Sequence, residues 1–257
     1  MTSPVQQDLV SCYFETSRGT KTHYLQSGPP TGPLLIALHG LGGSTNTFLP
    51  LLSVIPQTFR TVLVDFQGFG KTPPTADSSK PLSITGHVAD LHDLITSLQE
   101  PAAAEAASHL RGVVLVGHSL GAIGKIAITN GVRDRGIDFA EEIAARSNLH
   151  DGSEEAARDA VRREVETASD PEAYAQTAEA VVAPDHHDPN YARIRCPAVF
   201  VAGDRDVISP VDRSRDLSAL VGGPSWVEIV KSGHQPLLED PDAVRSAVGK
   251  LLSQVDV

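Results

Sequence analysis

Short apolar runs alternate along this chain with longer stretches that have helical spacing, and this alternation constrains the fold more than any other feature. It is typical of a mostly parallel sheet with helices on both faces, in which a buried strand reads as a nearly continuous apolar run. We therefore predict an α/β protein with a doubly wound sheet. The runs predicted to be strands are Ser11–Thr16, Thr22–Gln26, Leu34–His39, Thr61–Asp65, Val113–His118, Ala198–Gly203 and Trp226–Val230.

The first two runs lie close together and are separated by the turn-like residues Ser17-Arg18-Gly19. We expect them to form an antiparallel hairpin at an edge of the sheet. From Ile84 to Leu98, apolar residues recur every three or four positions, which predicts an amphipathic helix on one face of the sheet. A chain of 257 residues, 40% of them hydrophobic, is long enough to bury a sizeable core of this kind.

The stretch from residue 138 to residue 190 is rich in Ala, Glu, Asp and Arg with helical spacing. It holds 14 Asp and Glu against 4 Lys and Arg, and so carries −10 of the chain's net charge of −11. We interpret residues 138–190 as an acidic helical lid between an N-terminal part of the core, 1–137, and a C-terminal part, 191–257. The alternative is a set of ordinary covering helices with a solvated acidic face. An acidic lid is expected to disfavour anionic substrates, an effect that high salt should relieve.

Composition excludes several classes of function. An acidic chain without any basic run is not expected to bind nucleic acid, because phosphate contacts need clustered Lys and Arg. The longest apolar runs fall far short of the roughly 20 residues that span a bilayer, so no membrane span is expected. Cys12 and Cys196 lie far apart, and the N-terminal residues lack the pattern of a secretory signal, which favours a reduced, cytoplasmic protein. The oligomeric state is left open.

A candidate nucleophile follows the fifth predicted strand. Gly117-His118-Ser119-Leu120-Gly121 stands between an apolar run and Ala122-Ile123, which is the strand–turn–helix context of a G-x-S-x-G nucleophile elbow. The small flanking residues let the backbone turn sharply and expose a strained Ser119 hydroxyl. A lone G-x-S-x-G indicates no more than a turn serine, and the surrounding pattern is what favours a nucleophile here.

A serine hydroxyl needs a base, and the base needs a carboxylate to orient it. Two later predicted strands end in loops with suitable groups, because Asp204 and Asp206 follow one strand and His234 follows the next. The chain order Ser119, Asp206, His234 is the order found with this type of elbow. Asp206 is preferred as the acid, and Asp204 is the alternative, otherwise a loop-capping carboxylate. The alternative for His234 is a buried structural histidine.

With these motifs the chain resembles the α/β-hydrolase fold superfamily in its serine-hydrolase branch, and within it small esterases, enol-lactonases and C–C bond hydrolases. The family's acid stands at the D of a G-x-x-D-x-x-x-P run, which matches Asp206. A serine nucleophile argues against the dehalogenase and epoxide-hydrolase branches, which use aspartate there. Besides the elbow, the matching pieces are His39-Gly40-Leu41-Gly42-Gly43, Asp65-Phe66-Gln67-Gly68-Phe69-Gly70, Gly203 to Pro210, and Gly233-His234 followed by Leu238-Glu239-Asp240-Pro241.

The resemblance also implies two oxyanion donors, the backbone N–H groups of Leu41 and Leu120. Acyl transfer develops negative charge on a carbonyl oxygen, and fixed donors stabilise that charge. The glycines beside Leu41 allow close backbone approach, although a tight turn near the site also explains them. His39 and His118 are expected to orient loops through hydrogen bonds rather than to exchange protons.

One part of the family pattern is missing. Members of the family usually follow the elbow helix with another apolar strand before the lid, whereas polar residues follow Gly131 here. Ile126–Thr129 lies too close to Ser119 to be that strand, because a parallel crossover needs at least about 10–12 residues. We therefore predict a sheet reduced to seven strands, with none between residues 122 and 137. The strand Ala198–Gly203 must then pair with Val113–Val116 or leave a gap beside it.

The predicted function is that of a cofactor-independent serine hydrolase that cleaves a small ester, lactone or activated ketone through an acyl-enzyme on Ser119. The alternative is a catalytically silent or very slow ligand-binding protein, which the missing segment favours. No metal site is predicted, because the adjacent residues Asp185-His186-His187-Asp188 point in different directions and fit a solvated loop better. The partner is expected to be a small-molecule substrate, with Tyr174, Tyr191 and Val181 lining either its pocket or the lid core.

Overall fold

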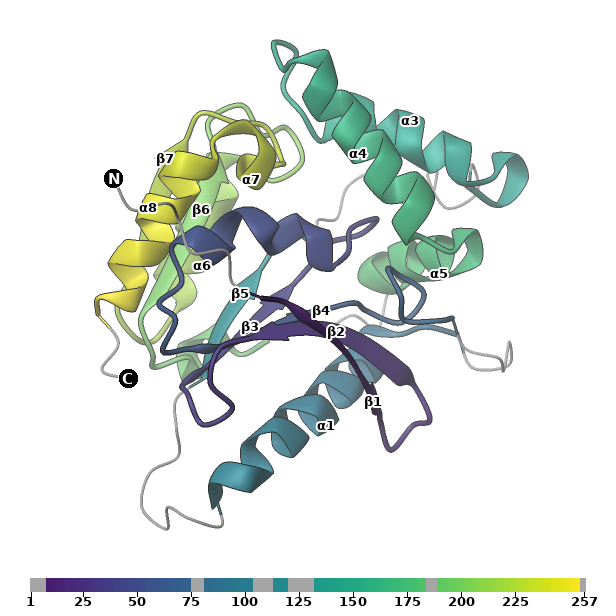
Figure 1. Cartoon of the computed structure of the whole chain (residues 1–257). Coiled ribbons are helices and arrows are strands. Elements are labelled where there is room, and N and C mark those ends of the chain that lie inside the picture. The colour runs from purple at the N-terminus through teal and green to yellow at the C-terminus, as the bar shows by residue number, and fades with distance from the viewer. Residues whose placement is uncertain (1–7, 75–80, 104–112, 120–131, 184–188, 255–257) are drawn as a thin grey trace.

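The computed structural model describes residues 8–74, 81–103, 113–119, 132–183 and 189–254. Its main sheet has the strand order β1-β2-β4-β3-β5, and a separate pair of strands, β6 and β7, lies beside it (Figure 1). β3 pairs in parallel with β4 and β5, and β6 pairs in parallel with β7. The predicted α/β fold is confirmed, and each predicted strand is found within one residue at either end: β1 (Val10–Glu15), β2 (Lys21–Ser27), β3 (Leu34–Leu38), β4 (Arg60–Val64), β5 (Val113–Gly117), β6 (Ala198–Gly203) and β7 (Ser225–Val230).

The predicted hairpin forms the outer edge of the main sheet. β1 and β2 pair antiparallel, and the register joins Val10 with Gln26 and Glu15 with Lys21. Gly19 lies in the connecting turn with a φ of 81°, a left-handed value that costs glycine little. β2 pairs antiparallel with β4, so the parallel part of the main sheet consists of β4, β3 and β5.

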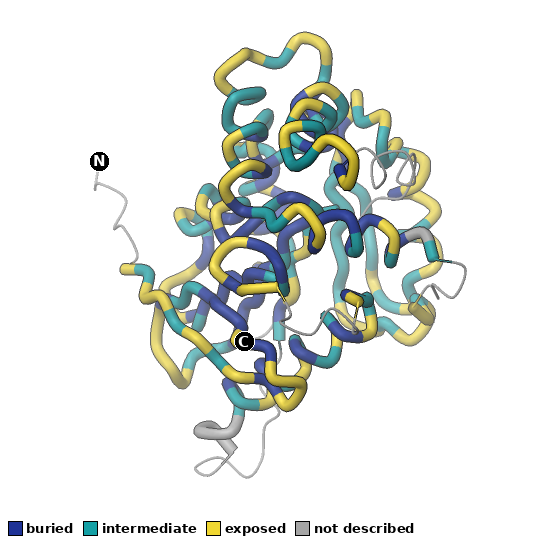
Figure 2. The backbone as a smooth tube through the Cα atoms, turned by 90° about the vertical axis from the view of Figure 1, so that its right-hand side faces the viewer, coloured by how far each residue is buried: buried dark blue, intermediate teal, exposed yellow. Residues whose placement is uncertain are grey.

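The centre of the main sheet is covered on both faces, as its apolar runs predict. Leu35 and Ala37 of β3 pack with apolar residues of η1 and α8, whereas Leu34 and Ile36 pack with α1 on the other face. Figure 2 shows these buried segments inside an exposed periphery. Burying each such side chain contributes about 1.5–3 kcal/mol, so the strands form a firm base for the loops at their ends. These covering helices are η1 (Thr45–Ser53), α1 (Ile84–Ala103) and α8 (Pro241–Leu252).

Three further helices, which we call the helical layer, lie beside the main sheet (Figure 1). Their apolar residues form one cluster with Phe69 from the loop after β4. Tyr174 is buried in this cluster together with Val161 and Val165. The last helix of this layer begins at Pro171, and the Asp170 carboxylate caps it by accepting a hydrogen bond from the Ala173 N–H (2.9 Å). The members are α3 (Ile137–Ser147), α4 (Glu155–Ala168) and α5 (Pro171–Val182).

The sheet is interrupted between β5 and β6. In the described ranges no backbone hydrogen bond joins these two strands, so the gap is found and not the direct pairing. The prediction that no strand lies between residues 122 and 137 falls mainly on residues 120–131, which are outside the described residues, and the reduced sheet stays a prediction. The remaining elements are η2 (Tyr191–Arg193), α6 (Val211–Leu220) and α7 (Pro236–Glu239).

Two sequence expectations concern the surface and the thiols. Within the described part of the chain, the helices are all too short or too polar to cross a membrane. Cys12 is partly buried and Cys196 is exposed, and both are free thiols. Neither finding assigns a cellular compartment.

Candidate active site

Three predicted side chains meet at the carboxyl ends of three strands. Ser119 lies just beyond β5, Asp206 follows β6 and His234 follows β7. His234 Nε2 is hydrogen-bonded to Ser119 Oγ, and His234 Nδ1 lies 2.8 Å from Asp206 Oδ2. The side chains of His234 and Asp206 are 9% and 8% exposed, so little water competes for this bond. A carboxylate bound to Nδ1 leaves Nε2 as the acceptor of the Ser119 proton.

The backbone at Ser119 is strained. Its φ is 27°, and it is the only described residue other than glycine with a positive φ. The loop after β3 packs directly against this turn, since a Cβ on Gly40 would lie 2.7 Å from the Ser119 carbonyl oxygen. Any side chain at Gly40 would push this loop off the turn. The predicted strain is therefore found at Ser119, which is half-buried rather than exposed.

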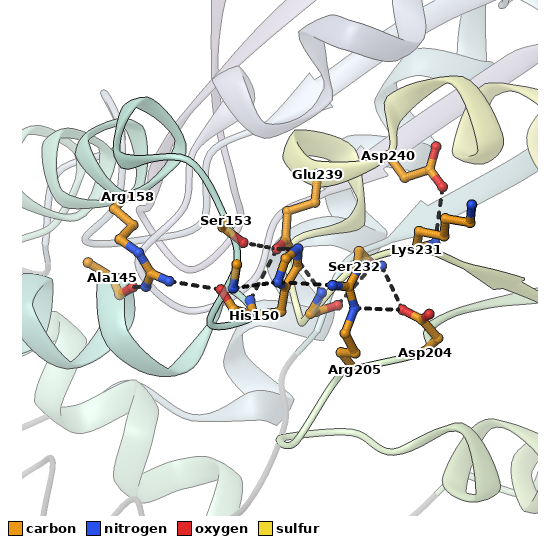
Figure 3. Close-up of polar contacts among 12 residues, drawn as sticks. Ala145, His150, Ser153, Arg158, Asp204, Arg205, Lys231, Ser232, Glu239 and Asp240 are labelled. Carbon is orange, nitrogen blue, oxygen red and sulfur yellow. Dashed lines mark hydrogen bonds and ion pairs between the residues drawn. The ribbon is translucent and has the colours of Figure 1, made fainter.

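The structure separates the two candidate acids. Asp206 uses Oδ1 to accept the N–H groups of Ile208 and Ser209, both at 2.8 Å, which leaves Oδ2 for His234. Burial raises the pKa of Asp206, but the hydrogen bond and charge of His234 and the two N–H groups outweigh it and hold the pKa below its usual value. Asp204 instead accepts the Ser232 N–H at 3.1 Å and the Arg205 guanidinium (Figure 3). Asp204 is therefore the loop-capping carboxylate.

One of the two predicted oxyanion donors, Leu41, lies within the described residues. Leu41 lies in the glycine loop that packs against the elbow. It also lines a cavity beside that loop. His39 holds this loop, because its Nδ1–H donates to the Gly40 carbonyl (2.7 Å) and its Nε2 accepts the Phe66 N–H (3.0 Å). Both ring nitrogens of His39 are thus occupied by backbone groups. Leu120, the second predicted donor, lies outside the described residues.

His118 connects the elbow to the histidine loop. Its Nε2–H donates to the carbonyl oxygen of His234 at 2.8 Å, and the two imidazole centroids are 5.5 Å apart. Burial, reinforced by the nearby His234, lowers the pKa of His118 to about 4. His118 is therefore neutral near pH 7 and acts through this hydrogen bond, as the sequence predicts.

Acid is expected to destabilise the fold through neutral buried histidines. Burial lowers the pKa of His87 to about 4, as it does for His118. Between pH 6.5 and about 4 the unfolded chain therefore binds protons that the folded chain does not, and stability falls as the pH falls through this window. Urea unfolding at pH 7 and pH 4.5 should differ by more than about 1.4 kcal/mol, the equivalent of one pKa unit. The double variant His87→Asn, His118→Asn should flatten this dependence, and an unchanged slope would contradict the assignment.

One cavity touches the three candidate catalytic side chains, and a second cavity lies next to it. The loop cavity, about 190 Å³, lies between the glycine loop, α4 and α7. The gap cavity, about 680 Å³, lies between β5 and β6 and touches Ser119, Asp206 and His234. His118 and Leu237 line both cavities. Glu164 of α4 lines the loop cavity, and it accepts hydrogen bonds from Ser44 Oγ and from Asn46 Nδ2 (3.3 Å).

Sequence reasoning missed the residue that ties the histidine loop to the helical layer. Glu239 is 3% exposed and accepts the Gly233 N–H (2.7 Å), the His150 N–H (3.1 Å) and the Ser153 hydroxyl (2.5 Å) (Figure 3). The His234 N–H also donates to the Asn148 carbonyl in the same connection between α3 and α4 (2.7 Å). Glu239 appears in a motif of the sequence, but two of its partners, His150 and Ser153, come from a segment about 90 residues away.

Glu239→Gln is expected to loosen this attachment. A glutamine keeps one acceptor oxygen and turns the other into a donor, which leaves the N–H of Gly233 or His150 unpaired. The free energy of unfolding should fall by about 1–3 kcal/mol, and kcat should fall with it because the His234 loop loses its anchor. Urea unfolding and ester hydrolysis measure both effects. Glu166→Gln, at an exposed position of α4, is the matched control, and equal effects of the two variants would contradict the role.

The residues that were predicted to line the pocket or the lid core lie in two different parts of the structure. Tyr174 and Val181 are buried in the helical layer, and Tyr191 lies in η2. Among the described residues, no group of three His, Cys, Asp or Glu side chains could hold a metal ion. Asp185-His186-His187-Asp188 lies outside the described residues, so its interpretation as a solvated loop stays a prediction.

Comparison with known proteins identifies the family of this chain. A family model described as the alpha/beta hydrolase family matches residues 35–247. The chain belongs to the alpha/beta hydrolase family. This match runs from β3 into α8 and so includes the strands that carry Ser119, Asp206 and His234. The expected family resemblance is confirmed.

The chain is similar to a curated protein in part of its sequence and to solved structures in its fold. "Putative carbamate hydrolase RutD" of Escherichia coli O139:H28 is 33% identical over 99 residues, which are 38% of this chain and 33% of the relative. The chain thus matches about a third of the length of these curated relatives. The enol-lactonase of Burkholderia xenovorans LB400 has a TM-score of 0.79 at 19% identity and covers 95% of this chain and 100% of its own. An esterase of Thermogutta terrifontis has a TM-score of 0.77 at 18% identity, covering 97% and 100%. At these identities the two structures support the fold alone.

Proposed function

We propose that this alpha/beta hydrolase family member is a cofactor-independent serine hydrolase that cleaves a small ester, lactone or activated ketone through an acyl-enzyme on Ser119. The observation that carries the proposal is the continuous contact from Ser119 Oγ through His234 to Asp206. Serine and imidazole become an effective nucleophile and base only in such an arrangement.

In the proposed mechanism Ser119 Oγ attacks the carbonyl carbon of the substrate while His234 Nε2 takes the hydroxyl proton. Asp206 holds the imidazole and stabilises the imidazolium that forms. The tetrahedral intermediate collapses, the bond to the leaving group breaks, and His234 gives its proton to that group. A water molecule then attacks the acyl-enzyme with His234 again as base, which releases the acid and restores Ser119.

We assign to the Leu41 and Leu120 N–H groups the stabilisation of the negatively charged oxygen in the tetrahedral intermediate. The close approach of Gly40 to the elbow supports the first of these, because it holds the glycine loop beside Ser119. A backbone donor of this kind is typically worth about 10²–10³ in kcat. The donors act with little reorganisation since the loop is held by His39.

We propose that residues 138–190 act as a lid over this site and that the loop cavity holds one half of the substrate. Glu164 supports this role, because it belongs to the helical layer and lines the cavity beside the glycine loop. The proteins to which the chain is similar are named as an enol-lactonase, an esterase and "Putative carbamate hydrolase RutD", and these names support a substrate that is cleaved at a carbonyl group. A small acyl compound is therefore the substrate class that we assign.

An anionic substrate is expected to react more slowly than a neutral one. The lid segment carries most of the chain's negative charge, and Glu164 places a carboxylate at the cavity. For p-nitrophenyl acetate against the p-nitrophenyl monoester of succinate, kcat/KM should favour the acetate. Raising the ionic strength from 0.01 M to 1 M shortens the Debye length from about 30 Å to about 3 Å and should narrow this preference. A preference that is independent of salt would contradict an electrostatic origin.

A fluorophosphonate probe tests the proposed function. An organised triad makes Ser119 nucleophilic enough to react, so the intact mass should rise by one adduct and peptide mapping should locate it on Ser119. A catalytically silent or very slow ligand-binding protein is the second candidate, and the interrupted sheet favours it. Absence of an adduct under conditions that label a control serine esterase would reject the hydrolase and favour that candidate.

A further inference from the structure

The gap cavity has no assigned part in the mechanism above. Its volume of about 680 Å³ falls within the roughly 300–1,000 Å³ of ligand sites. It reaches Ser119 and His234 at one end and the segment Arg193–Pro197, before β6, at the other. The cavity therefore extends from the candidate nucleophile along the whole length of the two strands that border it.

Two strand edges face this cavity, and no strand formed by the described residues lies between them. In the described ranges β5 pairs only with β3, and β6 pairs only with β7. Each strand therefore presents backbone N–H and C=O groups on its second edge, and such groups need partners when a ligand removes their water. A ligand with amide groups of its own would supply them.

The side chains around the cavity are mostly apolar. β5 contributes Val114 and Val116, β6 contributes Val199 and Val201, and α8 contributes Val248. Leu115 also lines the cavity and is 56% exposed, although it lies in the middle of an apolar strand. Apolar surface of this extent is typical of a binding site. The lining thus combines apolar side chains with two rows of polar backbone groups.

The strand directions orient a ligand in the cavity. Ser119, Asp206 and His234 meet, and each lies beyond the carboxyl end of its strand, so β5, β6 and β7 all end at the site. β5 has 5 residues and β6 has 6, which corresponds to roughly 17–20 Å of extended chain. An extended amide chain parallel to both strands would bring its terminal carbonyl to Ser119.

We propose that the gap cavity binds the acyl half of the substrate as an extended, apolar, amide-bearing chain that lies as a strand between β5 and β6 and ends with its reactive carbonyl at Ser119. This assignment rests on the proposed function and names the substrate class as esters of short apolar peptidyl or N-acylamino acids. The leaving group then occupies the loop cavity, which shares His118 and Leu237 with the gap cavity. The two edges provide the main-chain hydrogen bonds of strand addition, and the valines contact alternate side chains.

An unbranched alkyl chain fits this cavity less well. It would cover the apolar side chains but would leave the backbone groups of both edges without water or partners. Each unpaired group costs about 1–3 kcal/mol, so the apolar contact would be offset. A peptidyl ligand is therefore expected to form hydrogen bonds with the backbone edges of β5 and β6, whereas an alkyl ligand is not. Hydrogen exchange of the backbone amides in these strands distinguishes the two ligands.

Hydrogen exchange in the Ser119→Ala variant tests the proposal without depending on catalysis. The probes are N-acetyl-Ala-Val-Ala-amide and dodecanamide, which have similar length. At about ten times its Kd, the peptide amide should slow exchange of the β5 and β6 amides by roughly tenfold, and dodecanamide should leave them unchanged. Val199→Trp in the same background should abolish the protection by filling the cavity, and Val199→Ile should retain it.

Three outcomes would overturn the assignment. They are equal protection by both probes, protection by neither, and protection of β5 and β6 without a probe in a dimer detected by sedimentation, which would make a second copy the occupant. If Val199→Trp fails to fold, the comparison of the two probes in Ser119→Ala still decides. Labelling of wild-type Ser119 by a fluorophosphonate tests the proposed hydrolase separately, so either claim can fail while the other stands.

Discussion

Replacing Ser119 with alanine is expected to lower kcat/KM for a p-nitrophenyl ester by up to about 10⁶, with little change in the free energy of unfolding. The substitution removes the only atom that would form the acyl-enzyme. Alanine also lacks the hydroxyl that contacts His234, but it leaves the other hydrogen bonds of His234 in place. Steady-state kinetics and urea unfolding of both proteins measure the two effects.

The control for this variant is Ser253→Ala, at an exposed position after α8. Its activity should match the wild-type protein. Unchanged ester hydrolysis by the folded Ser119→Ala variant would end the serine-hydrolase assignment. A loss of activity in parallel with a loss of folded protein would instead indicate that the strained turn at Ser119 needs its hydroxyl for stability.

Replacing Asp206 with asparagine is expected to lower kcat by about 10⁴, the effect seen when the acid of a Ser-His-Asp triad becomes an amide. Asparagine can still accept the Ile208 and Ser209 N–H groups through Oδ1, so the loop should keep its shape. The amide group facing His234 would favour the wrong imidazole tautomer and could not stabilise the imidazolium. The pH dependence of kcat should change together with its value.

Asp204→Asn is the matched control in the same loop. Its Oδ1 can still accept the Ser232 N–H, so its kcat should stay within about tenfold of the wild-type value. A larger loss in Asp204→Asn than in Asp206→Asn would reverse the assignment of the acid. This pair of variants decides between the two carboxylates that the sequence leaves as alternatives.

Much of this fold follows from local pattern. The strand runs were located within one residue at either end because buried parallel strands are nearly all apolar and are bounded by polar or turn residues. The start of α5 was also predictable, since Asp170 and Pro171 are a cap and a first-turn residue. Ser119 could be singled out because its turn lies directly between a strand and a helical pattern.

Contacts between distant segments were not predictable in the same way. Nothing near Glu239 in the sequence indicates that its carboxylate accepts the His150 N–H and the Ser153 hydroxyl, or that the His234 N–H donates to the Asn148 carbonyl. These bonds depend on how the helical layer lies against the histidine loop. Local sequence patterns carry no information about how these two segments contact each other, because the bonded residues belong to neither the same strand nor the same helix.

The sequence by itself determined the order of the strands, the candidate nucleophile, the two alternative acids and the expectation that the sheet either closes or stays open after β5. These depend on periodicity and on residues next to one another in the chain. Only the tertiary structure decided that Asp206 and not Asp204 faces His234, and that β5 and β6 stay apart around a cavity that reaches Ser119. The physical reason is that side-chain direction in a loop and pairing between strands are set by packing across the molecule, which no local spacing encodes.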